Sequence, residues 1–142
     1  MIASSIDYLI PYKDMKNLIN NGLIVIGVDN SNVDRYTMSP DFNYLISGTR
    51  IHYAFRLWLI VALITIAISI YFSFTYEWWI FILGFGAASI IARANKKALY
   101  QNLLDKAQED AALYASMAVF GAILYNFKDD ELAKGVLERY KK

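Results

Sequence analysis

The chain has 142 residues, with 14 basic and 13 acidic side chains and a net charge of +1. This balance disfavours nucleic-acid binding, which requires a basic face, and the absence of cysteine excludes disulfides and thiolate metal sites. Hydrophobic residues make up 57% of the chain, which directs attention to membranes and buried helices.

Residues 1–52 are predicted to form a small cytoplasmic interaction segment that is too short to bury a large core unaided. Within it, residues 14–21 have the pattern of a short helix that ends at Gly22. The apolar run at residues 23–28, rich in Ile and Val, is typical of a β-strand.

An Asn-Ser-Asn turn signal at residues 30–32 then separates this strand from a second one, residues 35–38, which Pro40 stops. We therefore expect a helix followed by a β-hairpin. The stretch at residues 18–40 resembles the last helix and wing of a winged-helix domain. Its charges are balanced, unlike those of the DNA-binding members, so the resemblance implies an interaction module and no nucleic-acid contact.

Two uncharged apolar segments follow, residues 57–76 and 78–92, with Glu77 between them. As helices they would reach about 30 Å and about 22 Å, against a hydrocarbon thickness of about 30 Å. Residues 53–93 are therefore predicted to be a two-helix transmembrane hairpin. The fold class expected for the chain is a mainly α membrane protein.

Basic residues flank this hairpin on one side only, at Arg50, Arg56, Arg93, Lys96 and Lys97. Because positive charge marks the cytoplasmic side, both termini are expected to be cytoplasmic. The expected location is the bacterial inner membrane.

Small side chains recur at every fourth position in both segments, a spacing that lets two helix backbones approach closely. These predicted helix-packing residues are Thr65, Ser69, Ser73, Gly84, Ala88 and Ala92. Folding the hairpin about Glu77 places Ser69 at the depth of Gly84 and Thr65 at the depth of Ala88, so the two small faces match. A pore lining or a seam between subunits is the alternative role for this stripe.

Residues 94–142 are predicted to be a cytoplasmic helical region. Residues 93–120 contain neither Gly nor Pro, so the second membrane helix is expected to continue beyond the bilayer as one rod. Asp129 or Asp130 can cap a final amphipathic helix.

An uncharged stretch, residues 111–127, lies between these helices and is expected to be a buried helix. The part of the chain outside the bilayer is small and offers few residues to cover this helix. A second copy of the chain, in a homo-oligomer, or a partner protein is therefore expected to cover it. The predicted interface residues are Leu113, Met117, Phe120 and Leu124. The alternative is a third membrane span.

The sequence has few residues suited to catalysis, since His52 is the only histidine and no nucleophile or phosphate-binding motif occurs. We expect no enzymatic activity, cofactor, metal ion or small-molecule substrate. The function expected is that of a non-enzymatic two-pass membrane subunit that self-associates or docks a partner. The alternative is a membrane-perturbing, pore-forming effector triggered by a cytoplasmic partner, because the layout resembles the two-span effectors of bacterial defence systems.

Overall fold

The computed structural model describes residues 1–141 and divides into two compact units. The first unit combines residues 1–47 with residues 103–142, and the second consists of residues 48–102. The chain is mostly helical, with seven helices in the described part. The two segments that were expected to be separate cytoplasmic parts, residues 1–52 and 94–142, therefore contribute to one folded unit. The sequence could not show this, because the contacts that join them are remote in the chain.

A three-stranded antiparallel sheet joins the two ends of the chain in the first unit. Its strands are β1 (Ile2–Ser4), β2 (Ile24–Val28) and β3 (Ile123–Phe127), in the order β1-β3-β2. In this register Tyr125 of β3 lies opposite both Ala3 and Ile26, and all three side chains are buried. Successive side chains of a strand point to opposite faces, so this set defines the core face of the sheet.

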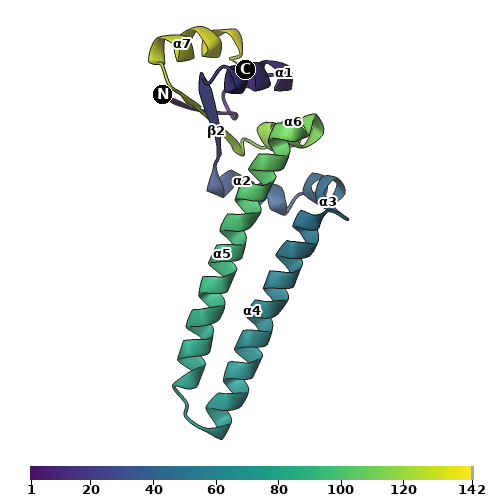
Figure 1. Ribbon diagram of the computed structural model, residues 1–142, viewed down its shortest axis with the longest axis vertical. Helices are drawn as coiled ribbons and strands as arrows, with labels where there is room; N and C mark the ends of the chain where they lie inside the picture. The colour runs from purple at the N-terminus through teal and green to yellow at the C-terminus, as the bar shows by residue number, and fades with distance from the viewer. Residues whose placement is uncertain (142) are drawn as a thin grey trace. The chain divides into compact units, whose positions relative to one another are not determined.

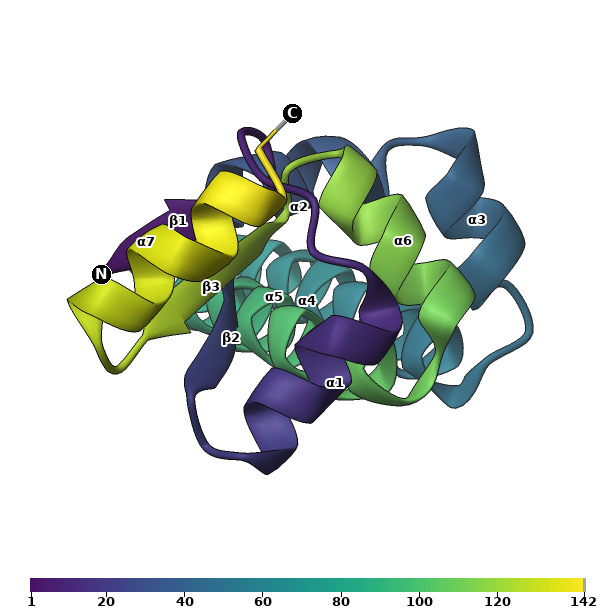
Figure 2. The same ribbon diagram turned by 90° about the horizontal axis from the view of Figure 1, so that it is seen from above.

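Three helices pack around this core: α1 (Tyr12–Asn20), α6 (Ala111–Val119) and α7 (Asp130–Arg139). Figure 2 shows them grouped about the sheet. Asp110 caps α6 and Asp129 caps α7, each carboxylate accepting hydrogen bonds from backbone N–H groups of the first turn. The predicted final helix and its aspartate cap are confirmed, as is the predicted first helix.

A buried pair of tyrosines ties the helices to the sheet. The Tyr114 hydroxyl donates to the Ile10 carbonyl oxygen at 2.7 Å and lies 2.8 Å from the Tyr125 hydroxyl. Burial raises the pKa of both phenols above the usual value, because a phenolate would lose its hydration there. The two hydroxyls satisfy each other and a backbone carbonyl, so this contact between β3 and α6 leaves none of these groups unpaired.

The predicted β-hairpin is wrong. Residues 35–38 lie not in a strand but at the end of α2 (Asn30–Thr37), which is followed by α3 (Pro40–Ile46). The Asp29 carboxylate accepts hydrogen bonds from the backbone N–H groups of Ser31 and Asn32, so the turn signal is the first turn of a helix. β2 pairs with β3 instead, and the resemblance to a winged-helix wing therefore fails.

The uncharged stretch at residues 111–127 is only half helical. α6 ends near Gly121, whose φ of 72° suits glycine, and the chain then continues as β3. Nine helical residues reach about 14 Å, far short of a bilayer. The alternative of a third membrane span is thus excluded by the structure.

The predicted interface residues have different positions in this unit. Leu113 and Met117 are fully buried by the chain itself, Leu124 is half-buried in β3, and Phe120 is 36% exposed beside the Tyr36 ring. The expectation that another subunit must cover Leu113 and Met117 is therefore wrong. Their cover comes from residues 1–47, which the sequence did not place beside them.

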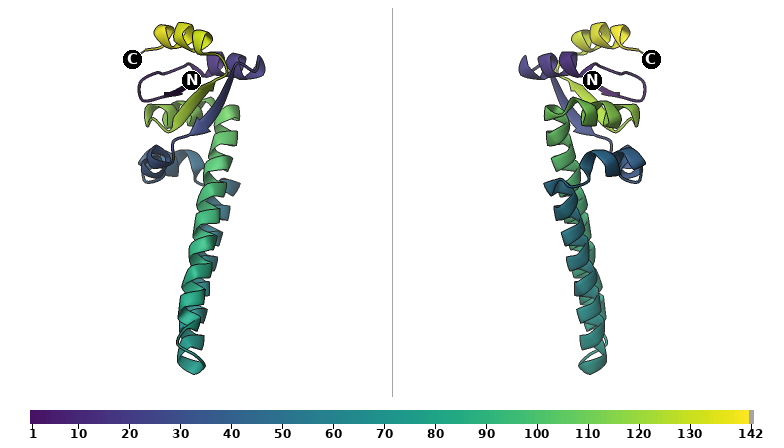
Figure 3. Two further views of the ribbon diagram at one scale, coloured as in Figure 1. Left: turned by 90° about the vertical axis from the view of Figure 1, so that its left-hand side faces the viewer. Right: turned by 90° about the vertical axis from the view of Figure 1, so that its right-hand side faces the viewer.

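The second unit contains two long helices, α4 (Arg50–Thr75) and α5 (Ile80–Glu109), joined by a short turn. Figures 1 and 3 show them side by side and antiparallel. α5 continues without a break beyond residue 102, which confirms the predicted rod as far as Glu109. In the described residues one helix, α4, is long and apolar enough to cross a membrane by length and composition, and only 11% of its most apolar stretch is buried.

Candidate functional site

The seam between α4 and α5 is built from small side chains. Ala62 and Ser69 of α4 and Ala88 of α5 are buried in it. A Cβ atom added to Gly84 would overlap the Cβ and Oγ atoms of Ser69, so glycine is needed for this close approach. The structure therefore brings Ser69 and Gly84 together, as the spacing of the small residues predicts.

The other predicted packing residues lie nearer the edges of the seam. Thr65, Ser73 and Ala92 are half-buried. The Thr65 hydroxyl donates to the Val61 carbonyl oxygen at 2.9 Å, and the Ser73 hydroxyl donates to the Trp78 carbonyl oxygen at 3.0 Å. These hydroxyls are satisfied by backbone oxygens of the pair itself, as polar groups in an apolar setting require.

Replacing Gly84 with leucine is expected to separate the two helices and lower the midpoint of thermal unfolding of the detergent-purified protein. The loss of helix association should be about 1–2 kcal/mol, because close backbone contact is what such pairs depend on. Gly86→Leu is the matched control, since no atom lies within 4 Å of a Cβ added at Gly86. Equal midpoints for the two variants would contradict this account of the seam.

Asn95 is a seam residue that the sequence prediction missed. It is buried, and its Nδ2 atom donates to the Phe55 carbonyl oxygen of α4 at 3.0 Å. A signal was present, because Asn95 follows Ala88 and Ala92 at the spacing of one helix face. The contact shows that α5 near residue 95 lies level with α4 near residue 55.

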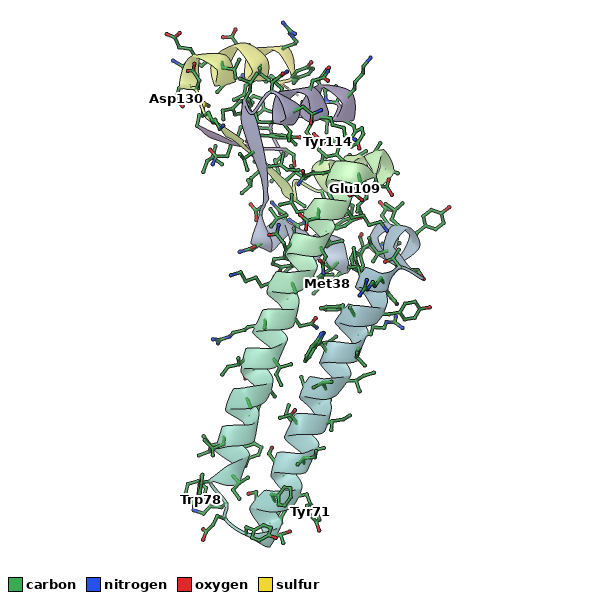
Figure 4. The ribbon with its side chains drawn as sticks, in the orientation of Figure 1. Met38, Tyr71, Trp78, Glu109, Tyr114 and Asp130 are labelled. Carbon is green, nitrogen blue, oxygen red and sulfur yellow. The ribbon has the colours of Figure 1, made fainter. Side chains whose placement is uncertain are left out.

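This alignment of the two helices shows where the first charged residue of each one lies. Arg56 is the last charged residue before the apolar part of α4, and Arg93 is the first after that of α5. With Asn95 beside Phe55, both arginines lie at one end of the pair. Figure 4 places Tyr71 and Trp78 at the other end, where the chain turns. An uncharged band with large exposed apolar side chains lies between the two ends.

A second candidate site is a groove in the first unit, between α1 and α7, with a volume of about 380 Å³. Leu18, Leu132 and Val136 give it an apolar floor, and the Tyr140 hydroxyl closes one side by donating to Asp14 at 2.6 Å. This hydrogen bond raises the pKa of Tyr140, because it favours the protonated phenol. Gly135 also lines the groove, and no atom lies within 4 Å of a Cβ added there.

No protein-family model, no curated protein and no solved structure matches this chain. The helix pair and the groove between α1 and α7 are therefore the features that indicate a function.

Both surfaces suit binding. The helix pair offers apolar side chains to a hydrophobic environment, and the groove offers an apolar floor with one carboxylate and the Arg139 guanidinium at its margin. Among residues 1–141 no group of three or more His, Asp or Glu side chains is placed to hold a metal ion. His52, the only histidine in the sequence, packs its ring against Tyr53 with centroids 5.9 Å apart.

Proposed function

We propose that α4 and the apolar part of α5 cross a lipid bilayer as a hairpin that anchors the α/β unit at the membrane surface. The observation that supports this most is the exposure of α4, because an apolar helix of 26 residues with so little burial exposes its side chains to whatever surrounds it. In water, the apolar surface of this helix would far exceed the area of contiguous apolar surface that soluble monomers usually expose. Lipid is the medium that suits it.

The dimensions of the pair support two spans. The uncharged band of α4, residues 57–75, reaches about 28 Å, and residues 80–92 of α5 reach about 20 Å. The shorter helix gains length from Trp78 and Trp79, which are exposed at the turn and suit a headgroup interface. Arg93 can extend its guanidinium to the opposite interface.

The orientation we propose places residues 1–49 and the C-terminal part of the chain in the cytoplasm, because the basic residues of the pair lie at that end. There the protein acts as a non-enzymatic anchoring subunit. Its docking surface is the groove between α1 and α7, whose half-exposed leucines and valine would accept an apolar face of a partner protein.

Cysteine labelling in intact cells tests this topology. The chain has no cysteine, so a single introduced one reports its own location. Thr75→Cys, at the end of α4, should react with a membrane-impermeant thiol reagent, while Ser31→Cys and Glu138→Cys should react only after lysis. Labelling of all three variants in intact cells, or recovery of the protein in the soluble fraction, would contradict the proposal.

The same purified protein distinguishes an anchor from a pore-forming effector. An anchor reconstituted into vesicles loaded with a fluorescent dye should leave the dye inside. Protein-dependent release of the dye would instead favour the effector, in which hairpins of several copies rearrange into a conduit.

A further inference from the structure

An apolar groove in the helix pair lies beside two cations and has the features of a lipid site. It has a volume of about 340 Å³ and is lined by Trp58, Ile90, Ile91, Ala94, Asn95 and Ala98. Trp58 is 49% exposed and Ile90 is 69% exposed, so their apolar surfaces are left uncovered by the chain. Two alanines on α5 leave room for a narrow ligand to lie along the helix.

The groove lies at the end of the pair where the charges begin. Its Asn95 donates a hydrogen bond to the Phe55 carbonyl oxygen, and its Trp58 lies in the first turn of the apolar part of α4. In a bilayer this is the depth at which acyl chains give way to headgroups. A ligand here would have an apolar part toward the bilayer and a polar part at its surface.

Two cations, Arg93 and Lys97, are next to groove residues along α5. They are four residues apart on α5 and therefore neighbours on its surface, and each is three residues from a groove residue, Ile90 or Ala94. Both side chains are exposed, and no carboxylate in residues 1–141 pairs with either. Lys96 is engaged elsewhere, since its Nζ atom lies over the Tyr100 ring at 5.6 Å from the centroid.

We propose that this groove binds one anionic phospholipid, with an acyl chain against Trp58 and Ile90, toward the bilayer, and the phosphate between Arg93 and Lys97. A guanidinium forms paired hydrogen bonds with phosphate oxygens, and the ammonium adds a point charge one turn away. A wholly polar ligand would leave the groove unfilled, and a neutral lipid would leave the two cations without counter-charge. The inference rests on the proposed membrane insertion of α4 and α5.

The test uses full-length protein reconstituted into two kinds of vesicle: phosphatidylcholine alone, and phosphatidylcholine with phosphatidylglycerol. Retained lipid is counted by native mass spectrometry after detergent extraction. The wild type should keep one phosphatidylglycerol, and Arg93→Gln/Lys97→Gln should bind it about 30-fold more weakly, since each cation near the surface is worth about one factor of five. Ala94→Phe should lose the lipid by filling the groove.

The matched control is Arg56→Gln/Lys96→Gln, which removes the same charge from the same end of the pair but leaves the rim of the groove intact. It should keep the lipid. Equal loss in both double variants, or retention by Arg93→Gln/Lys97→Gln, would overturn the site in favour of general surface attraction. Incorporation into pure phosphatidylcholine vesicles reports insertion separately, so failure there counts against the anchor, whereas incorporation without selective retention counts against the lipid site alone.

Discussion

An arginine in place of Ile68 is expected to prevent α4 from entering a bilayer. Ile68 lies near the middle of the apolar stretch, and its side chain is 51% exposed. Near the centre of a membrane helix an isoleucine contributes about −0.3 to −0.6 kcal/mol and an arginine costs about 2.5 to 3.5 kcal/mol. The substitution therefore costs about 3–4 kcal/mol of insertion, and the fraction of protein that floats with vesicles should drop sharply.

Tyr53→Arg is the control on the same helix. Tyr53 is 65% exposed and lies between Arg50 and Arg56, where a further arginine meets headgroups and water. This variant should float as the wild type does. A protein whose α4 lies in water would tolerate arginine at either exposed position, so equal flotation of the two variants would argue against a span.

Leu113→Ala is expected to destabilise the first unit by about 2–5 kcal/mol, the range for a buried leucine that leaves a cavity. The Leu113 side chain has no solvent exposure, because residues 1–47 and the sheet of its own chain cover α6. Urea denaturation of the detergent-purified protein, followed by circular dichroism, measures the change. The oligomeric state should stay that of the wild type.

Val119→Ala provides the comparison within α6. Its side chain is 67% exposed, and surface truncations usually change stability by less than about 0.5 kcal/mol. If Leu113→Ala instead kept full stability and dissolved an oligomer, then Leu113 would lie in an interface between subunits, as the sequence predicts, and not in the core of the first unit.

The helices were predictable where the information is local. The absence of Gly and Pro from residues 93–120 predicts that α5 continues beyond its apolar part, and it does so as far as Glu109. Asp129 before an amphipathic run predicts the start of α7. The match of Ser69 with Gly84 followed from spacing alone, because a short turn fixes the depth at which two antiparallel helices meet.

The sheet was not predictable in this way. β2 was expected to pair with the next stretch of chain, since adjacent segments form hairpins most easily, yet its partner β3 comes from the far end of the sequence. Residues 35–38 have strand-like composition, but the Asp29 cap directs the preceding residues into a helix. The groove between α1 and α7 depends on the same long-range pairing, so no local pattern could have indicated Gly135 as part of a surface site.

The central position of β3 has a consequence for synthesis on the ribosome. β1 and β2 flank it and do not pair with each other, and both leave the ribosome before either long helix does. At about 5–20 residues per second, translation delivers β3 only seconds later. During that interval the N-terminal strands lack β3, their only partner in the sheet. In the topology we propose, α4 and α5 are therefore available for insertion before the sheet can be completed.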